Sequence, residues 1–354
     1  MATSSDISCD GAWAKYFNSS EDVALPNGDT FRVYRAGSQG PHVVLLHGGG
    51  YTSMTWCLVA AMLKEACRVY AIDLRGHGQT HTSADVDLSI DTLVVDTLQV
   101  MELLIPPMAL EEDGNADLEN PQTIIVGHSL GGALGVRIAA TGKVLSLVGV
   151  MVIDVVEGTA MASLKHMGSI LERRPSRFRS YKEAVDWALR SGTVHNVEAA
   201  EVSIPSQLKQ LEDGMLVWKT DLASSSKYWN GWFTGLSKQF LSLKEAKVLV
   251  LAGSDRLDTE LLRGQMMGKF EMRLVYSSGH AIQEDCPHEV ANFITDLCSR
   301  CARVKTGIIF RSDGVVAAQP MKRSFLAERL QKARAMIPEE GVLSADDHSK
   351  PSPQ

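Results

Sequence analysis

The sequence lacks a surplus of basic charge. Its 354 residues carry 35 Lys and Arg against 42 Asp and Glu, a formal net charge of 35 − 42 = −7 at pH 7. Proteins that bind nucleic acid along the phosphate backbone need a basic surplus or a basic stripe. The charge balance therefore argues against nucleic acid as a partner.

Long apolar runs are also missing. The longest, Val144 to Val156, is interrupted by Ser146, Gly149 and Asp154 and is too short to cross a bilayer. The polar segment Met1 to Asp10 has no apolar core of the kind that a signal peptide requires. We therefore expect no membrane contact and a cytoplasmic or nuclear location.

Cysteines are few, and they form no pattern typical of a secreted domain. The chain has six, so reduced thiols are the expectation. Cys298 and Cys301 make one C-x-x-C pair, but a zinc site needs two further ligands at suitable spacing, and the sequence offers none. We therefore predict no metal site.

Short apolar runs alternate with helical patterns along most of the chain. The predicted strands are Thr30–Tyr34, His42–Leu46, Val69–Asp73, Thr123–Val126, Leu145–Ile153, Lys247–Ala252 and Met272–Tyr276. The predicted helices are Thr55–Lys64, Ser89–Leu104, a helix ending at Ala140, and Pro287–Ser299. This alternation predicts an α/β fold with a mostly parallel sheet covered by helices on both faces.

The alternation stops between Glu157 and about Ala246. The sequence of this segment is polar, has helical patterns and contains four of the six tryptophans. We interpret residues 157–246 as a helical lid inserted over the carboxyl edge of the sheet, where open α/β sheets bind ligands. The α/β domain, with this insertion, would then span residues 1–302. Residues 303–354 would form a partly disordered extension, with one amphipathic helix at Phe325–Met336.

The segment Gly127-His128-Ser129-Leu130-Gly131 fits the pattern G-x-S-x-G. A buried strand precedes it and a helix of small residues follows, as a nucleophile elbow requires. The turn would expose Ser129 Oγ at the N-terminus of that helix, where developing negative charge is stabilised. The alternative is a serine that only caps a helix in an ordinary loop. We favour the nucleophile because both flanking elements are present.

A serine hydroxyl needs a base, and in this fold the chain order is serine, acid, histidine. Five histidines follow Ser129: His166, His195, His280, His288 and His348. His280 lies just after the last predicted strand, from which a loop can reach the serine. We therefore predict His280 as the base.

The residues themselves leave the acid open. Asp154 ends the strand after the serine, whereas Asp255 and Asp258 follow the next predicted strand. Either place can hold the carboxylate that orients the imidazole. The later strand is the usual place in this fold, but the spacing does not decide between Asp154 and Asp255.

An oxyanion hole needs two backbone N–H donors. One is expected from Leu130, the residue after the serine. The other is expected from the glycine run after the second predicted strand, His47-Gly48-Gly49-Gly50, and Gly49 is the best candidate. Glycines allow the backbone to turn its N–H groups toward a ligand.

These motifs together resemble the α/β-hydrolase superfamily. Further blocks resemble the protein phosphatase methylesterases over roughly Trp13 to Leu297. They are Ile153–Met161, Tyr228–Phe233, Ala252–Asp258, and Gly279–Ala281 with Glu284–Asp285. This sequence departs from the pattern of the family in two places. The stretch Gln207–Trp218 is short where the animal members carry a long acidic insertion, and the tail after Arg303 has no counterpart in the family.

The resemblance implies a serine carboxylesterase that needs no cofactor. Its substrate would be the methyl ester on the C-terminal leucine of the protein phosphatase 2A catalytic subunit. The resemblance also implies that Asp154 completes the triad with Ser129 and His280, whereas Asp255 and Asp258 are structural or face the partner. Nothing in the sequence calls for more than a monomer.

Two other functions stay open at this stage. The chain could be an α/β hydrolase of small esters or lipids, with an apolar lid and turnover that needs no protein partner. It could also be a phosphatase-binding protein whose main effect is stoichiometric inhibition. The complete set of triad residues argues against binding alone.

Overall fold

The computed structural model describes residues 11–105, 122–253, 257–305, 309–311 and 314–316. The chain divides into two compact units, Met1–Pro320 and Met321–Gln354, and all described residues belong to the first. The predicted amphipathic helix Phe325–Met336 and most of the predicted C-terminal extension lie outside the described residues.

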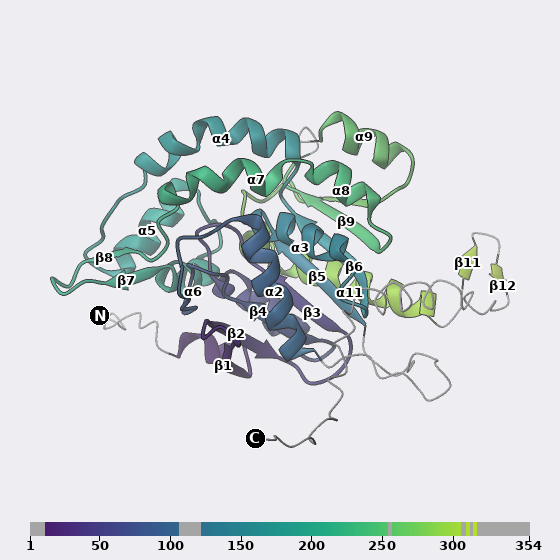
Figure 1. Cartoon of the computed structure of the whole chain (residues 1–354), viewed down its shortest axis with the longest axis horizontal. Helices are drawn as coiled ribbons and strands as arrows, with labels where there is room; N and C mark the ends of the chain where they lie inside the picture. Colours follow the sequence, from purple (N-terminus) through teal and green to yellow (C-terminus); the bar gives the residue numbers. More distant parts are fainter. Residues whose placement is uncertain (1–10, 106–121, 254–256, 306–308, 312–313, 317–354) are drawn as a thin grey trace, which may run out of the picture. The chain divides into compact units, whose positions relative to one another are not determined.

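An eight-stranded sheet forms the centre of this unit, in the order β1-β2-β4-β3-β5-β6-β9-β10 (Figure 1). Its strands are β1 (Ser19–Ala24), β2 (Thr30–Ala36), β3 (His42–Leu46), β4 (Arg68–Ile72), β5 (Thr123–His128), β6 (Leu147–Ile153), β9 (Ala246–Leu251) and β10 (Glu271–Leu274). The strands from β4 to β10 in this order run parallel to one another, whereas β2 pairs antiparallel with both of its neighbours, β1 and β4. The predicted mostly parallel α/β sheet is confirmed.

Helices connect the parallel strands and cover the sheet. The helices outside the insertion are α1 (Cys57–Leu63), α2 (Ile90–Leu104), α3 (Leu130–Thr141), α9 (Thr259–Met266), α10 (Ile282–Asp285) and α11 (Pro287–Lys305). Two 3-10 turns, Ala12–Lys15 and Ser53–Trp56, and a small hairpin, β11 (Ile309–Arg311) and β12 (Gly314–Val316), complete this part. Ser89 caps α2 by accepting a hydrogen bond from Thr92 N, as expected of a helix start.

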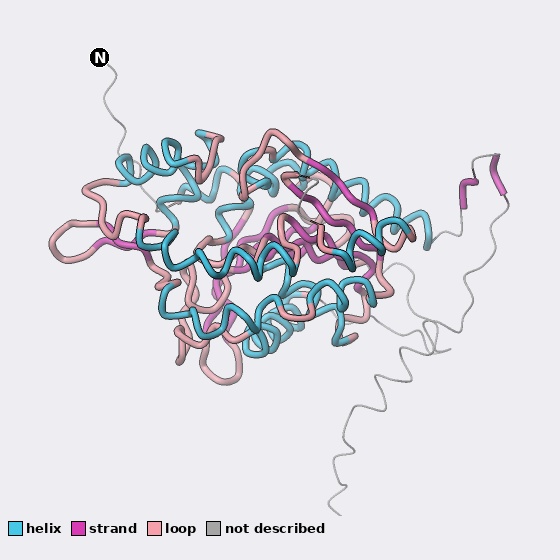
Figure 2. Tube along the Cα trace, turned by 90° about the horizontal axis from the view of Figure 1, so that it is seen from above, coloured by secondary structure: helices cyan, strands magenta, loops and turns pink. Residues whose placement is uncertain are grey.

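Both faces of the sheet are buried, which is why its strands read as continuous apolar runs. In β3, Val43 and Leu45 pack into one core cluster together with residues of α1 and α11. Val44 and Leu46 point the other way, into a second cluster with residues of α2 and α3. Figure 2 shows the strands lying between the two layers of helices.

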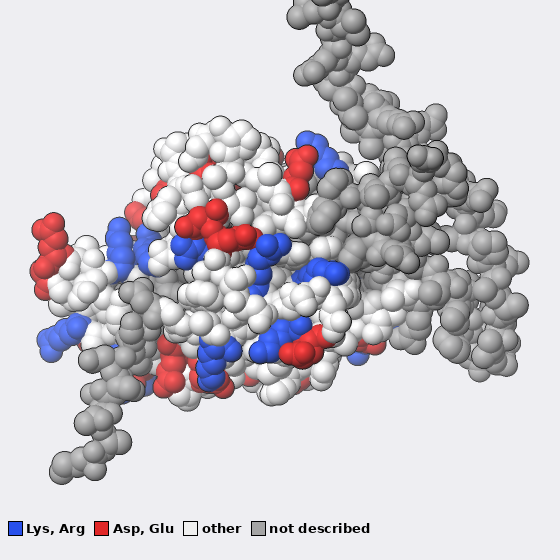
Figure 3. All heavy atoms as spheres, turned by 90° about the horizontal axis from the view of Figure 1, so that it is seen from below, with Lys and Arg blue, Asp and Glu red and all other residues white. Residues whose placement is uncertain are grey.

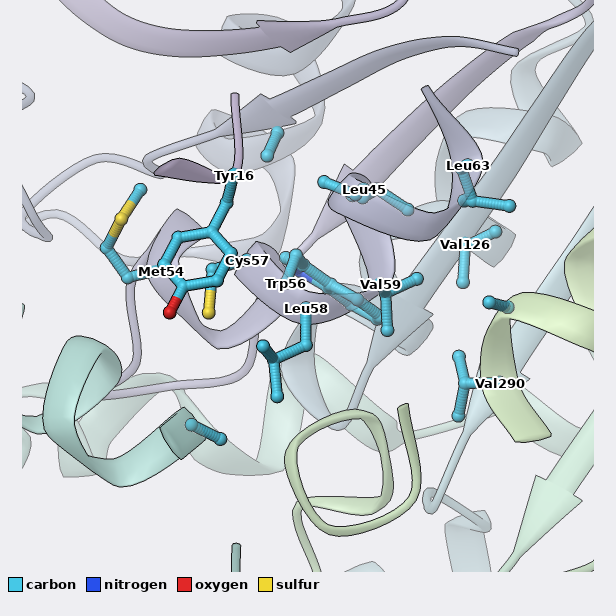
Figure 4. Close-up of a cluster of buried hydrophobic side chains, with 14 of the residues drawn as sticks. Tyr16, Leu45, Met54, Trp56, Cys57, Leu58, Val59, Leu63, Val126 and Val290 are labelled. Carbon is cyan, nitrogen blue, oxygen red and sulfur yellow. The ribbon is translucent and has the colours of Figure 1, made fainter. Parts of the chain in front are cut away.

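Trp56 is the largest side chain that is fully buried in the first cluster, with 0% of its surface exposed. Figure 4 shows its indole among Leu45, Leu58 and Val59, so it joins a strand of the sheet to α1. The turn that ends at Trp56 follows the glycine loop after β3. Packing of this indole therefore fixes the chain just after the glycine loop, which belongs to the candidate site.

The segment between β6 and β9 is an insertion of helices and one hairpin. It contains α4 (Glu157–Glu172), α5 (Tyr181–Ser191), α6 (Val197–Ser206), β7 (Leu208–Gln210), β8 (Leu216–Trp218), α7 (Trp229–Phe233) and α8 (Leu236–Ser242). The purely helical prediction for this segment was wrong at β7 and β8, whose three-residue strands are too short to show a period. Strand β1 was also missed, because its sequence SSEDVA is mostly polar and none of its residues is buried.

Charges of both signs are mixed on the surface. Figure 3 shows Lys and Arg interspersed with Asp and Glu on the face in view, without a continuous basic stripe. Within the ranges that the structure covers, no helix has the length and apolarity needed to cross a bilayer.

Replacement of Trp56 by alanine should lower the free energy of unfolding by about 3–5 kcal/mol, because a large cavity opens in a rigid core. Chemical denaturation followed by circular dichroism measures this loss. The matched control is Val95→Ala on α2, where the side chain is 54% exposed and the expected change is within about 0.5 kcal/mol. Equal effects of the two substitutions would contradict this assignment of the core.

Candidate active site

The predicted site residues all follow strands at the carboxyl edge of the parallel sheet. Ser129 follows β5, Asp154 follows β6, and His280 lies beyond β10. The glycine loop His47–Gly50 follows β3. Because β3, β5 and β6 are neighbours and parallel, their carboxyl ends meet at one edge, where this fold class binds ligands.

Two of these residues have strained backbones. Ser129 has φ 51° and ψ −117°, and Asp154 has φ 50°. In the described part of the chain, these are the only residues other than glycine with positive φ. Such conformations cost about 1–3 kcal/mol each and cluster at functional sites. The strain at Ser129 is that of a strand-to-helix turn with the serine at its apex.

Two glycines allow this turn to form. A Cβ on Gly127 would lie 2.1 Å from the carbonyl oxygen of Gly131, and a Cβ on Gly131 would lie 2.2 Å from that of Leu46. Both distances are far inside van der Waals contact. The glycines of G-x-S-x-G are therefore needed so that β5, α3 and the end of β3 can approach one another.

Asp154 and His280 form a close pair. His280 Nδ1 lies 2.7 Å from Asp154 Oδ2, and the other oxygen, Oδ1, accepts a hydrogen bond from Ala252 N at 3.1 Å. The Asp154 side chain is fully buried, whereas that of His280 is 49% exposed. A buried carboxylate that holds one ring nitrogen leaves the other nitrogen free to act as a base.

The other acid candidates have different positions. Asp255 lies outside the described residues. Asp258 caps α9 by accepting a hydrogen bond from Leu261 N at 2.9 Å, and it also accepts one from Ser237 Oγ at 2.5 Å. Its carboxylate is thus engaged in local structure, as expected for a capping residue.

Ser129 is partly exposed, although the residues on either side of it are buried. Among the described residues, the structure has no hydrogen bond between the Ser129 side chain and His280. Catalytic hydrogen bonds are often long or poorly aligned without substrate and tighten in the complex. Ser129 and His280 therefore lie at the same edge of the sheet without a hydrogen bond between them.

The amides of Leu130 and Gly49 are available for an oxyanion. Leu130 is the first residue of α3, and first-turn N–H groups have no partner within their helix. Within the described ranges, neither amide donates to a protein acceptor. The next amide of the loop, Gly50 N, is already bound to His77 Nε2 at 2.9 Å.

Two buried histidines hold the glycine loop in shape. His47 Nδ1 donates to Gly48 O at 2.8 Å while its Nε2 accepts from Leu74 N at 3.0 Å. His77 Nδ1 donates to Arg75 O at 2.7 Å. Burial lowers the pKa of His47 to about 4 and that of His77 to about 3, so both rings stay neutral and can accept a backbone N–H. Sequence reasoning assigned neither histidine a role.

The loop that carries His280 is fixed from two sides. His128 Nε2 lies 2.9 Å from His280 O, which ties this loop to the residue before the serine. Asp285 accepts from Gly279 N at 2.8 Å and also binds His195 of the insertion, through its amide at 2.7 Å and its Nδ1 at 2.8 Å. Asp285 thus links the loop that carries His280 to the insertion. The block Glu284–Asp285 was noticed in the sequence, but no role was assigned to it.

The insertion covers the glycine loop. Side chains of Leu222 and Trp232 come within 3.5 and 3.8 Å of the position that a Cβ on Gly49 would occupy. The Trp232 indole donates to Leu88 O at 2.6 Å, which fixes it on the main body. Trp187 and Trp218 instead pack together with Phe178 inside the insertion. Of these three tryptophans, only Trp232 lies against the loop.

No group of three or more His, Cys, Asp or Glu side chains in the described residues could hold a metal ion. Cys298 and Cys301 pack in the hydrophobic core beside the sheet.

Comparisons with known proteins agree with this geometry. The model of the alpha/beta hydrolase family matches residues 43–293. Protein phosphatase methylesterase 1 of Mus musculus is 39% identical over 335 residues, which cover 81% of this chain and 84% of the mouse protein. The chain belongs to the protein phosphatase methylesterase family of α/β hydrolases. It is thus a carboxylic ester hydrolase of the serine type.

Other members of the methylesterase family are similarly close. The protein of Homo sapiens is 38% identical, with 81% of this chain and 84% of the human protein covered. A probable protein phosphatase methylesterase 1 of Caenorhabditis elegans is 43% identical over 283 residues, which cover 79% of this chain and 74% of that protein.

Solved structures support the hydrolase fold of this family member. E-2-(Acetamidomethylene)succinate hydrolase superposes with a TM-score of 0.64 at 19% identity, covering 79% of this chain and 99% of that one. An esterase of Mycobacterium tuberculosis gives 0.60 at 21% identity, with coverages of 79% and 92%.

A buried carboxyl group lies beside the His280 loop. Glu284 is 1% exposed, and its Oε1 accepts a hydrogen bond from Thr55 Oγ1 at 2.6 Å. Burial raises its pKa from 4.5 to about 8. The folded protein therefore binds a proton at Glu284 near neutral pH that the unfolded chain releases. This contribution to stability is complete below pH 4.5 and is lost as the pH rises through about 8.

The substitution Glu284→Gln should remove this pH dependence, because the amide is a neutral isostere of the protonated acid. Between pH 5 and pH 9, the stability of the variant relative to wild type should rise by about 2–4 kcal/mol. Urea denaturation at both pH values measures it. Glu201→Gln, at an exposed position of α6, is the control and should show no such trend. A flat difference for Glu284→Gln would contradict a neutral Glu284.

Proposed function

We propose that this protein removes the methyl ester from the C-terminal leucine of the protein phosphatase 2A catalytic subunit. The catalytic residues of the proposal are Ser129, Asp154 and His280, and the amides of Leu130 and Gly49 form the oxyanion hole. The observation that carries it is the 2.7 Å contact of His280 Nδ1 with Asp154 Oδ2 at the edge where the strained Ser129 also lies.

In the first half of the proposed reaction, His280 Nε2 takes the proton of Ser129 Oγ, and the oxygen attacks the ester carbonyl. The amides of Leu130 and Gly49 stabilise the negative charge that forms on the carbonyl oxygen. The intermediate collapses when the C–O bond to the methoxy group breaks. His280 returns its proton to that oxygen, methanol leaves, and the leucine stays bound to Ser129 as an acyl-enzyme.

In the second half, His280 takes a proton from a water molecule, which attacks the acyl-enzyme. The Ser129 ester bond breaks, the serine regains its proton and the leucine carboxylate is released. Asp154 holds the imidazole in one tautomer and stabilises its charged form in both halves. No metal or organic cofactor takes part in these steps.

The remaining parts of the proposal concern the partner. The substrate ester lies at the end of a peptide, so the proposed active site has to accept an extended tail. Since Ser129 and His280 are not engaged with each other, binding of that tail would complete their alignment. We further propose that the protein acts as a monomer in the cytoplasm or the nucleus and that neither nucleic acid nor a membrane is a partner.

The direct test is demethylation of purified, methylated protein phosphatase 2A. Wild type should release methanol and leave the phosphatase unmethylated, whereas Ser129→Ala should be slower by at least about 10³-fold, because the nucleophile is gone. Loss of the methyl group is followed with an antibody specific for the demethylated tail. Binding of the phosphatase to Ser129→Ala should persist.

Other outcomes would favour the other functions. No demethylation together with fast hydrolysis of p-nitrophenyl acetate would point to a hydrolase of small esters. Failure in both assays, with phosphatase binding retained, would point to an inhibitory binding protein.

The choice of acid has a separate test. Asp154→Asn should lower kcat by about 10⁴-fold, because an amide cannot stabilise the charged imidazole and favours the wrong tautomer. Asp255→Asn is the matched control and should keep kcat within about threefold of wild type. Both are measured with p-nitrophenyl acetate, so the result does not depend on the protein substrate. The reverse order of effects would assign the acid to Asp255.

A further inference from the structure

An unpaired arginine lies beside the glycine loop. Arg174 follows the C-terminal end of α4, in the insertion, and it is only partly exposed. Among the described residues, its guanidinium has neither an ion pair nor a hydrogen bond. Arginines that are withdrawn from water are normally paired, since an uncompensated charge is costly to desolvate.

Contacts with an aromatic ring and with the glycine loop hold this guanidinium in place. Its Cζ lies 3.3 Å from the ring centroid of Trp218, a stacked cation–π arrangement. The Trp218 indole is itself fixed by a 2.8 Å hydrogen bond to Pro175 O. Arg174 Nη1 also lies 3.8 Å from the position that a Cβ on Gly50 would occupy. Gly50 is adjacent in the chain to Gly49, the proposed oxyanion donor.

Among the described residues, no carboxylate forms an ion pair with this guanidinium or shifts its pKa. Burial lowers the pKa of Arg174 to about 10, with the phenol of Tyr51 as the only group that opposes this shift, so the side chain is still a cation at neutral pH. Residues 173–179 carry four arginines in a chain of net charge −7. Of these four, Arg177 alone has a carboxylate partner in the described structure, Asp213 at 3.2 Å.

We infer that Arg174 is a specificity-determining residue that binds an anionic side chain of the substrate peptide, near the ester that Ser129 attacks. The inference rests on the proposed function for the nature of the substrate. The group that it recognises is a carboxylate or a phosphate a few residues before the C-terminal leucine. Stacking on Trp218 holds the planar guanidinium in place, so that its N–H groups can bind such an anion in a bidentate way.

A purely structural role explains the observations less well. Stacking on Trp218 requires a flat or apolar side chain, but it does not require a charge. The face of the guanidinium stacks on Trp218, and Nη1 at its edge lies beside the loop at Gly50. The nearby Arg173 and Arg179 are exposed and would attract an acidic tail toward the same side.

The test uses peptides that end in leucine methyl ester. The parent peptide has glutamine at the positions before leucine, and each other peptide replaces one of them by glutamate or by phosphoserine. For wild type, one position should give a kcat/KM about 10- to 100-fold above that of the parent, the value of a charge-assisted contact. Comparison of kcat/KM for glutamate and for phosphoserine at that position shows whether the site prefers a carboxylate or a phosphate.

Arg174→Met should abolish this preference, because the thioether keeps the length of the side chain but not its charge. Its kcat/KM on the all-glutamine parent and on p-nitrophenyl acetate should stay within about twofold of wild type. Arg177→Met, in the same segment, is the control and should keep the preference. If Arg174→Met does not fold, Arg174→Lys replaces it and should reduce the preference at least threefold, since an ammonium cannot bind bidentately.

Equal kcat/KM for charged and neutral peptides in wild type, or an unchanged preference in Arg174→Met, would overturn the inference. Failure of the proposed function gives a different pattern, in which no leucine methyl ester is cleaved although p-nitrophenyl acetate is. In that case, the free-acid peptides are tested as inhibitors of p-nitrophenyl acetate hydrolysis. A lower Ki for the acidic peptides that disappears in Arg174→Met supports the anion site, and equal Ki values reject it.

Discussion

The tight turn at Ser129 is the constraint on which the rest of the site depends. Its positive φ is possible only because β5, α3 and the end of β3 come closer than any side chain between them would permit. That approach brings the glycine loop after β3 next to the first amide of α3. The close approach of the backbones at Gly127 and Gly131 thus affects both the exposure of Ser129 and the distance between the expected oxyanion donors. These donors are the amides of Leu130 and Gly49. The stable packing of a two-sided α/β sheet holds this strained geometry in place.

The second level of organisation is a network of backbone tethers made by side chains that take no part in the proposed chemistry. His47 and His77 hold the glycine loop. His128 binds the carbonyl of His280, and Asp285 binds the amide of Gly279. Neutral rings are needed at His47 and His77, because each accepts a backbone N–H. Asp285 also binds His195 of the insertion, so one carboxylate links the insertion to the loop that carries His280.

Much of this could be predicted from the sequence, for identifiable reasons. Ser129 and His280 follow from a local motif and a chain-order rule. The acid did not follow, because β6 and β9 are neighbours and either strand end can reach the imidazole; Asp154 in fact binds both Val250 O and Ala252 N of that region. The link from Asp285 to His195 joins segments 90 residues apart and has no local signature. Strands β1, β7 and β8 were missed because they are polar or very short.

The pairing of Asp154 with His280 spans 126 residues of chain, and the whole insertion lies between them. Closing a long loop costs somewhat more conformational entropy than closing a short one, and long-range contacts of this kind slow folding. During synthesis, the ribosome therefore releases the serine and its carboxylate well before the base exists. A chain that ends between β6 and His280 contains Ser129, Asp154 and the glycine loop but lacks the imidazole that is proposed to activate the serine. If the proposed triad is the catalytic one, the order of its residues along the chain delays esterase activity until the last of them, His280, has been added.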